Sequence, residues 1–520
     1  MEKLKTQSNT IFHYVYAVLF SFITIGATTV LFKNVYVVIF TALFLLVIVL
    51  GVGRLYEFKK DITSKQVNIF FIVMISVMFI LQLVAGYCLQ STPITDWYTL
   101  DVIAKNFAQD GNFTNMYNGL PTDRYNYMAR YTNNNGVLIL LSLYYRVIYL
   151  AFGYVPGFAP VVLNTIFITT SVVFTFLISK RLFKPIGVLF TAVACFLFAP
   201  FYTYTAYYYS DSLSIPFTTI SIYLIILGVQ TAQEKLSKKI LFLVLAGLST
   251  AVGYTIKGSI LVILVGAIVY IILAHKLKET VISIVSIVLA FVIFMSGINM
   301  FINSFNFVTE EELYEEQYPI NHWIMMGLNG NGSFNLKDAS ATRKAGNYDE
   351  KKEYANKEIV KRIGDMGIEG MVEHLYHKSS FTWSDGTYWI NYHLNSKDAD
   401  GNEIENRNPL FEFVLKDGKY IGLFSAYSNA FHVCMLFMMI VSAYFMAKKK
   451  QITEMTLIHG VIFGVALFFL IWETRSRYLY NFTPLFLLAG VNGATLLFDN
   501  VNLPKLKLNF RKPKHQKHKT

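Results

Sequence analysis

The sequence predicts an all-α protein that crosses a membrane about twelve times, and both composition and apolar patterning carry that prediction. Hydrophobic residues make up 54% of the 520 residues, whereas charged residues make up only 15%. Soluble domains of this size carry more charge. Runs of about twenty apolar residues, the length that a helix needs to span a bilayer, recur along most of the chain. The chain is therefore expected to be a polytopic membrane protein.

The apolar runs can be placed as spanning helices one after another. The chain starts with basic residues and continues with an apolar run that lacks a small-residue cleavage site, which favours a first span over a removed signal peptide. A further apolar stretch, 135–152, is ambiguous between a span and a helix that stays on one side. The predicted spans are 11–32, 35–53, 68–90, 158–179, 186–206, 212–230, 239–256, 258–274, 279–302, 426–447, 455–471 and 478–498.

The basic loops decide how the ambiguous stretch is placed. Short loops rich in Lys and Arg mark the cytoplasmic side of a membrane protein. If 135–152 crossed the bilayer, the first basic loop would lie inside the cell and the later ones outside. We therefore expect a re-entrant or interfacial helix there, with both termini in the cytoplasm. The basic segments are 54–65, 180–184, 233–239, 274–279, 447–450 and the tail 504–520.

Charge and composition also indicate location and partners. The net charge is +12, and the basic tail favours contact with anionic lipid over nucleic acid. Abundant Phe, Tyr, Ile, Asn and Lys residues are typical of AT-rich bacterial genomes, so we expect a multi-pass protein of a bacterial plasma membrane. The three cysteines all lie in apolar runs, which predicts neither a disulfide framework nor a zinc site.

This topology divides the chain into parts and collects its outward-facing charged groups on one face. Such a face is a candidate active site when spanning helices otherwise avoid charge. The predicted parts are two N-terminal spans with a basic loop (1–66), a transmembrane core (67–302) that contains a first outer loop (91–157), an extracytoplasmic segment (303–425), C-terminal spans (426–500) and a basic tail (501–520).

Two aspartates stand where apolar runs meet the outer face. Asp96 lies in "ITDWYTLD", whose following apolar residues recur at helical spacing, and Asp211 lies in "YYYSDSLSIPF". Each could simply cap a helix, since Asp is a favoured N-cap. A carboxylate at the boundary of water and lipid could also take a proton from an acceptor hydroxyl. Asp101, one turn after Asp96, is expected to be a solvated helix residue.

Three cations share the predicted outer face. Lys257 sits in a short outer turn, where it either snorkels to lipid headgroups or binds a lipid-linked phosphate. Arg475 and Arg477 lie near one helix end, and their guanidinium groups suit bidentate contact with phosphate. Glu473 either pairs with these arginines or contacts a substrate.

Amide and aromatic side chains could complete a substrate site. Asn133 and Asn134 either cap a helix or offer hydrogen bonds to sugar hydroxyls. Tyr209 belongs to a tyrosine cluster that either forms an interfacial aromatic belt or lies against the substrate. Trp383, near Asp385, either stacks on a sugar ring or packs the outer segment onto the membrane. Metal-ligand spacing and a nucleotide phosphate loop are missing, so no cofactor is expected, while a divalent metal stays open.

The layout of these features resembles that of the GT-C glycosyltransferases. The resemblance rests on an Asp that opens the first outer loop, a second Asp in the next outer turn, a large outer segment late in the chain and a final turn with arginines. It is most similar to the bacterial branch related to protein O-mannosyltransferases and the lipid A aminoarabinose transferase. The segment "WIMMGLNGNGSFN…WSDGTYW" looks like that of Gram-positive members. The first two spans, 11–53, look like an addition before the usual first helix.

The resemblance implies an inverting hexosyltransferase. It would move one sugar from a polyprenyl-phosphate carrier to a cell-envelope acceptor, such as a teichoic acid, another glycan, a lipid or a protein. Asp96 corresponds to the catalytic carboxylate and Asp211 to the second acidic position. The residues that would hold the donor phosphate are Lys257, Arg475 and Arg477.

The chain departs from the family pattern at both acidic positions. Trp97 follows Asp96 where a Glu is common, and no Asp-x-Asp surrounds Asp211, so metal dependence is not expected. The expected partners are the lipid-linked sugar donor, the envelope acceptor, membrane lipid, and a sugar-lipid synthase and a flippase encoded nearby.

Two other functions fit the same layout. A polysaccharide transporter or flippase of lipid-linked glycans also needs many spans, but it predicts polar residues deep inside them, and these spans are nearly free of charge. A non-catalytic scaffold for envelope assembly predicts that no outward-facing aspartate matters. The sugar, the acceptor and the oligomeric state are not predicted.

Overall fold

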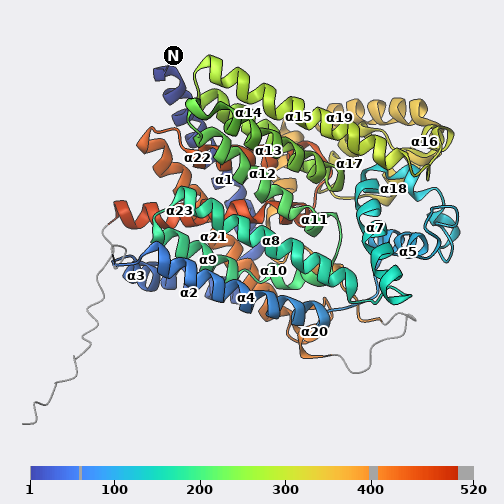
Figure 1. The fold of residues 1–520 in the computed structure, drawn as a ribbon, viewed down its shortest axis with the longest axis horizontal. Helices are drawn as coiled ribbons and strands as arrows, with labels where there is room; N and C mark the ends of the chain where they lie inside the picture. The colour runs from blue at the N-terminus through green and yellow to red at the C-terminus, as the bar shows by residue number, and fades with distance from the viewer. Residues whose placement is uncertain (1, 58–60, 398–407, 502–520) are drawn as a thin grey trace, which may run out of the picture.

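The computed structural model describes residues 2–57, 61–397 and 408–501, and these residues form helices and no β-strand. A bilayer core offers no water to backbone N–H and C=O groups, and a helix satisfies them internally. The apolar runs accordingly form long helices that pack side by side (Figure 1). This confirms the predicted class of an all-α polytopic membrane protein. The predicted basic tail 504–520 lies outside the described residues.

Ten helices among the described residues are long and apolar enough to span a membrane, or eleven if a pair bent by 55° counts as one span. This number is close to the predicted number of about twelve, and two shorter apolar helices are not counted in it. The spans predicted at 35–53 and 258–274 are the shorter apolar helices Val35–Leu50 and Gly258–Ala274. The helices of the bundle are α1 (Glu2–Leu31), α2 (Val35–Leu46), α4 (Ser64–Cys88), α8 (Ala159–Leu182), α9 (Pro185–Leu197), α12 (Ile215–Gln230), α13 (Leu236–Ile256), α14 (Leu261–Ala274), α15 (Leu277–Asn303), α21 (Ile421–Lys449), α22 (Glu454–Ile471) and α23 (Thr483–Asn500).

Helix α7 (Asn135–Phe152), the ambiguous stretch, does not carry the chain across the bundle. Helix α4 ends and α8 begins at the same end, because the rings of Tyr87 and Phe158 meet with centroids 5.7 Å apart. Residues 153–158, which join α7 to α8, reach at most ~20 Å, less than the ~30 Å hydrocarbon core. In Figure 1 α7 runs across the direction of α4 and α8 at one end of the bundle. The re-entrant or interfacial placement therefore agrees with the geometry, although α7 is one of the ten helices counted by length and composition.

The start of the chain, two of the predicted basic loops and the residue that follows a third loop meet at the opposite end. The Lys5 ammonium donates to the backbone carbonyl of His275. The Asn9 amide donates to the carbonyl of Gln451 at 3.0 Å, and Lys239 Nζ lies 3.3 Å from the Nε2 atom of His275. This gathering at one end is the arrangement that the charge pattern predicted. The other end is called the outer end below.

Helix α1 is part of the bundle rather than an addition to its outside. Its Phe20 ring meets Trp383 with centroids 5.3 Å apart. A Cβ atom at Gly26 would lie 2.3 Å from Ser380 Oγ, so α1 and α19 approach closely at this glycine. The first span thus supports the same region as the outer segment.

The predicted outer segment is only partly outside the bundle. It contains a long helix that bends at Gly367, where φ is +59°, a left-handed conformation that glycine adopts without strain. Beyond the bend the helix packs against α1, so its last turns belong to the bundle. The segment's helices are α16 (Glu310–Glu316), α17 (Ile320–Gly327), α18 (Leu336–Lys344), α19 (Tyr348–Trp383) and α20 (Pro409–Val414).

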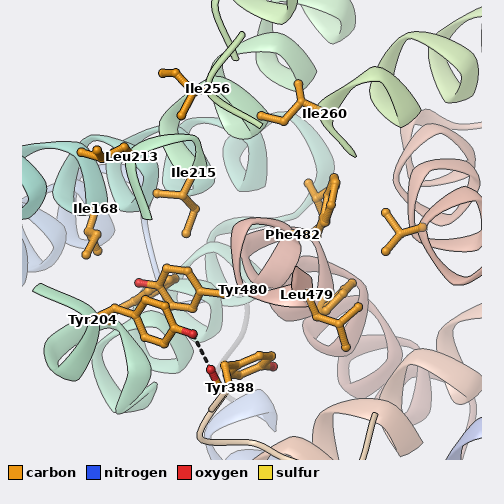
Figure 2. Packing of buried hydrophobic residues seen from close by; sticks show 14 of the residues in the cluster. Ile168, Tyr204, Leu213, Ile215, Ile256, Ile260, Tyr388, Leu479, Tyr480 and Phe482 are labelled. Carbon is orange, nitrogen blue, oxygen red and sulfur yellow. Dashed lines mark hydrogen bonds between the residues drawn. The ribbon is translucent and has the colours of Figure 1, made fainter. Parts of the chain in front are cut away.

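Stacked tyrosines join three distant parts of the chain near the outer end (Figure 2). The rings of Tyr204 and Tyr480 are parallel with centroids 3.6 Å apart. The Tyr204 hydroxyl donates to the backbone carbonyl of Tyr388, which follows α19. Tyr207 and Arg477 are close in sequence to the stacked pair, so this packing fixes the position of both.

Candidate active site

Six ionisable side chains from separate segments converge at the outer end, and we call them the polar cluster. They come from the helix after α4, the turn before α12, the turn after α13 and the turn between α22 and α23. Sequence reasoning placed each of them on the outer face, and the structure brings them together. The members are Asp96, Asp211, Lys257, Glu473, Arg475 and Arg477.

Asp211 is fully buried and is held between two cations. Lys257 Nζ lies 2.5 Å from Asp211 Oδ1, and Arg477 Nη1 lies 3.8 Å from Oδ2. Burial lowers the pKa of Lys257, and the Asp211 charge opposes that shift. Removing charges from water is costly unless they are paired, and this pairing offsets the cost. Lys257 therefore turns inward to a carboxylate and does not snorkel to lipid headgroups.

Neither aspartate is an N-cap. Helix α5 (Thr95–Asp110) is capped at Ile94, and the short helix α11 (Ser210–Leu213) is capped at Tyr209. Both aspartates stand in the first turn, so the interpretation of each as a capping residue is wrong. Thr95, just before Asp96, has a φ of +55°, which is strained for a β-branched residue. Such strain persists where surrounding contacts impose it, often at functional sites.

Asp96 is the accessible carboxylate of the polar cluster. Its side chain is 38% exposed, whereas Asp211 is fully buried and Glu473 is 4% exposed. Its ion-pair partner is Arg124, whose Nη1 lies 3.8 Å away. An exposed carboxylate with one distant ion pair can receive a proton from a molecule that arrives from water.

Glu473 is buried without an arginine partner. Its Oε1 accepts a hydrogen bond of 3.0 Å from the Tyr478 hydroxyl, and none of the ion pairs found among residues 2–57, 61–397 and 408–501 joins it to Arg475 or Arg477. The expected pairing of Glu473 with the arginines is therefore not present. Burial raises the pKa of Glu473, the Asp96 carboxylate raises it further, and Arg477 opposes both.

The two arginines keep donor atoms free inside the protein. Arg477 Nη1 donates to the Tyr207 hydroxyl at 2.7 Å, and its guanidinium carbon lies 5.3 Å from the Tyr209 ring centroid. The guanidinium of Arg475 lies over Trp389 at 5.6 Å. The Nε atoms of both arginines are buried and have no hydrogen-bond partner. Buried donors are costly to leave unpaired, so this pattern indicates a site for an anion.

The predicted amide site is engaged within the protein. Asn134 donates to the Tyr127 hydroxyl at 2.7 Å and accepts from the Tyr209 hydroxyl at 3.2 Å. Asn134 occupies the N-cap position of α7 without a side-chain capping bond. The Asn133 side-chain amide donates to the Asn134 side-chain oxygen at 3.4 Å. Tyr209 thus links Asn134 to the Arg477 side chain, and contact of Asn133, Asn134 or Tyr209 with a substrate stays a prediction.

Trp383 and Asp385 serve the packing of the protein. Trp383 is 2% exposed and its ring packs against Phe486 at 5.3 Å, so the predicted stacking on a sugar is excluded. Asp385 Oδ2 accepts from the Trp389 backbone N–H at 2.8 Å and from the Ser476 hydroxyl at 2.9 Å. Asp385 thus fastens the segment after α19 to the turn that carries both arginines.

Asp101 differs from its prediction as a solvated residue. It is 2% exposed, and its Oδ1 accepts hydrogen bonds from Tyr145 at 2.7 Å and Tyr208 at 3.0 Å. Lys105 Nζ lies 2.6 Å from its other oxygen. This buried network locks α5 to α7, which holds Asp96 in place.

The sequence analysis missed His393 and gave Tyr207 only as a member of the tyrosine cluster of Tyr209. The imidazole of His393 stacks on the Tyr207 ring with centroids 4.6 Å apart and an angle of 13°. Both lie beside Arg477, but a single His in a polar stretch gives no spacing pattern that could reveal this. Among the described residues, no group of three or more His, Cys, Asp or Glu side chains could hold a metal ion.

A groove of about 640 Å³ runs along α19, apart from the polar cluster. Its walls include Val30, His374, His377 and Phe381, and none of its lining residues belongs to the polar cluster. One of its lining residues, Phe381, has its ring 5.8 Å from that of Trp389, which contacts Arg475.

Comparison with known proteins gives one family. A family model described as "Conserved hypothetical integral membrane protein" matches residues 9–497. The crystal structure of ArnT from Cupriavidus metallidurans in the apo state is similar over 82% of this chain and 78% of that chain, with 11% identity and a TM-score of 0.30. A likeness of that strength carries no argument about function. No curated protein matches the chain.

Proposed function

Because the chain belongs to the family of conserved hypothetical integral membrane proteins, whose description assigns no activity, we propose its function from the polar cluster. We propose an integral membrane glycosyltransferase of the GT-C type that moves a single sugar from a polyprenyl-phosphate donor to a cell-envelope acceptor. The observation that carries this proposal is the juxtaposition of two arginines, each with a buried and unpartnered Nε atom, and a partly exposed carboxylate, Asp96.

The arginines supply the donor half of the site. A sugar linked to a phosphate is already activated, so its transfer needs cations for the departing phosphate and a base for the acceptor. Arg475 and Arg477 have free donors for that phosphate. Lys257 is engaged with Asp211, so we assign this pair to holding Arg477 in place rather than to the phosphate itself.

Asp96 supplies the acceptor half. The acceptor hydroxyl loses its proton to the Asp96 carboxylate while its oxygen attacks C1 of the sugar. The bond between C1 and the phosphate oxygen breaks, and its electron pair stays with the lipid phosphate. Attack opposite the leaving phosphate inverts the configuration at C1. Asp211 is fully buried and held by two cations, which makes it a positioning residue in this scheme.

The proposal also implies on which side of the membrane the site lies and which other proteins supply the sugar donor. The outer end faces away from the basic loops, so we place the site on the outer face of a bacterial plasma membrane. A lipid-linked donor reaches that face only if a synthase attaches the sugar and a flippase turns the lipid over. We propose that the arginines supply the positive charge for the departing phosphate and that the transfer needs no metal cofactor.

The test is sugar transfer by purified protein. Wild type and Asp96→Asn are compared with labelled polyprenyl-phosphate sugars and envelope acceptors, and Asp96→Asn is expected to lose at least ~100-fold in rate, as removal of a general base does. Asp365→Asn, an exposed aspartate on α19, is the matched control and keeps the rate. Equal rates for wild type and Asp96→Asn would remove Asp96 as the base.

One observation bears on the transporter alternative. The bundle does contain polar side chains between α1, α21, α22 and α23, including His13 and His459. Ser442 lies 3.0 Å from His459 Nε2 and receives a hydrogen bond of 2.7 Å from Asn492. Ser442, His459 and Asn492 are fully or nearly fully buried and bond to one another, and the His13 ring packs against His459 with centroids 5.2 Å apart, which suits contacts between helices better than a transport path. If cells need the protein to export a glycan but the purified protein transfers sugar from no donor, the transporter function is favoured. If the protein is a scaffold, the Asp96→Asn variant should keep full function in cells.

A further inference from the structure

His393 lies inside the site without a role in the scheme above. It is 8% exposed, and its ring stacks on Tyr207, whose hydroxyl accepts the hydrogen bond from Arg477. The Nε2 atom of His393 is buried and has no hydrogen-bond partner. A buried imidazole normally bonds through both nitrogens or through ordered water, so an open Nε2 beside two arginines points to a ligand.

The backbone around His393 is built to hold this position. Tyr388 and Trp389 both have positive φ, +54° and +65°, which bulky residues rarely adopt. The Asp385 carboxylate fixes the turn through the Trp389 N–H and reaches Ser476, which stands between the two arginines in sequence. A strained turn maintained by such bonds indicates that the placement of His393 and Trp389 is specified.

The charge state of His393 suits an anion that is already surrounded by cations. Burial, together with Arg477 and Arg475, holds the pKa of His393 well below 6.5. The ring is therefore neutral near pH 7 and carries one N–H. A neutral donor adds a hydrogen bond for a phosphate without adding repulsion between cations.

We infer that His393 contacts the substrate: its Nε2–H donates a hydrogen bond to a non-bridging oxygen of the lipid-linked phosphate, and with Arg475 and Arg477 it completes an anion site. For the transfer step the inference rests on the proposed function. When the C1–O bond breaks, the phosphate gains negative charge, so this hydrogen bond strengthens in the transition state and raises kcat.

Binding of a prenyl monophosphate tests the anion site without any transfer. Calorimetry on the purified full-length protein compares farnesyl phosphate with farnesol, which lacks the phosphate. Wild type is expected to bind the phosphate more tightly. His393→Ala should weaken farnesyl phosphate about 10- to 100-fold, as loss of a hydrogen bond to a charged group does, and leave farnesol unchanged. His393→Gln, which keeps an N–H donor, should recover part of the affinity.

His377→Ala is the matched control, because that imidazole is 62% exposed on α19 and lies outside the polar cluster. Thermal unfolding of each variant separates misfolding from lost contact, and the partial rescue by Gln does so again. Wild type without preference for the phosphate, or His393→Ala with wild-type affinity for it, would overturn the inference.

Transfer kinetics separate this inference from the proposed function. With an active donor, His393→Ala should lower kcat about 100-fold and raise KM much less, as removal of a transition-state donor does. If kcat is unchanged, the inference fails while the glycosyltransferase stands. If farnesyl phosphate binding depends on His393 but no donor is transferred, the anion site stands and the proposed function fails.

Discussion

Asp96 and Asp211 are carboxylates of one cluster in different surroundings. Asp96 is 38% exposed and 3.8 Å from its arginine, whereas Asp211 is buried and lies 2.5 Å from a lysine. Exposure fits Asp96 for proton transfer with water-borne molecules. Asp211 is buried between two cations, and its negative charge compensates the charges of Lys257 and Arg477.

Asp211→Asn is expected to lower the free energy of unfolding by about 3–5 kcal/mol, because it leaves Lys257 and Arg477 buried without a counter-charge. Thermal unfolding of the purified protein measures this. The double variant Asp211→Asn with Lys257→Met removes both charges of the close pair, so it should be more stable than Asp211→Asn alone. Additive losses in this double-mutant cycle would mean that the ion pair contributes no coupling.

For single residues, the sequence predicted which charged side chains lie on the same face of the protein, but it did not predict which of them form ion pairs. Helix ends and loop charges placed Asp96, Asp211, Lys257 and the arginines on one face. Pairing depends on distances of a few ångströms between turns far apart in the chain, such as Lys257 and Asp211. His393 gave no pattern at all, because its importance comes from what surrounds it in space.

At the scale of elements, the contact between α7 and α13 leaves no room for a side chain at Gly136. A Cβ atom at Gly136 would lie 2.1 Å from the backbone oxygen of Thr255, two residues before Lys257. The N-terminus of α7 therefore sets the position of the turn that carries this lysine.

Gly136→Ala should separate α7 from α13, lower the unfolding temperature by several degrees and reduce transfer, because one extra methyl group in a packed contact costs about 1–3 kcal/mol. Gly157→Ala is the control, since no atom lies within 4 Å of a Cβ there. A stable and active Gly136→Ala protein would show that this contact does not position Lys257.

The outer segment is expected to lose stability in acid. Burial lowers the pKa of His322, in α17, to about 4, below the ordinary 6.5. The unfolded segment therefore binds the proton more readily, so stability is full above pH 6.5 and falls as pH drops toward 4. The loss is on the order of 3 kcal/mol. Hydrogen exchange of α17 to α19 across this range measures it, and His322→Gln should flatten the dependence.

The sequence predicted most helices because apolar periodicity fixes their existence and approximate ends. It could not predict the bend of α19 at Gly367 or the return of its last turns to the bundle. That return depends on Gly26, Phe20 and Trp383, three residues whose contacts are visible only in the folded chain.

At the scale of the whole molecule, the topology can be tested by labelling. In a background without the three native cysteines, Tyr154→Cys and Lys357→Cys should react with a membrane-impermeant thiol reagent added outside cells, and Lys235→Cys should not. All three positions are exposed in the structure. Protection of Tyr154→Cys from the outside would mean that α7 crosses the membrane.

The all-α polytopic class was predictable because a bilayer leaves a chain few alternatives. The ends of single helices were less predictable, since the run predicted at 35–53 is the apolar helix Val35–Leu50 in the structure. The side of the membrane on which the site lies stays a prediction from the charge of the loops.

The hydrogen bonds of α1 have a consequence for the order of assembly during synthesis. Asn9 is bonded to Gln451 and to Thr456, partners made more than four hundred residues later. Until the ribosome delivers α22, the first helix lacks the partners that join its N-terminal turns to the C-terminal helices. In a chain interrupted before that point, the first helix is not yet tied to α22, so the bundle closes only after its C-terminal helices have been made.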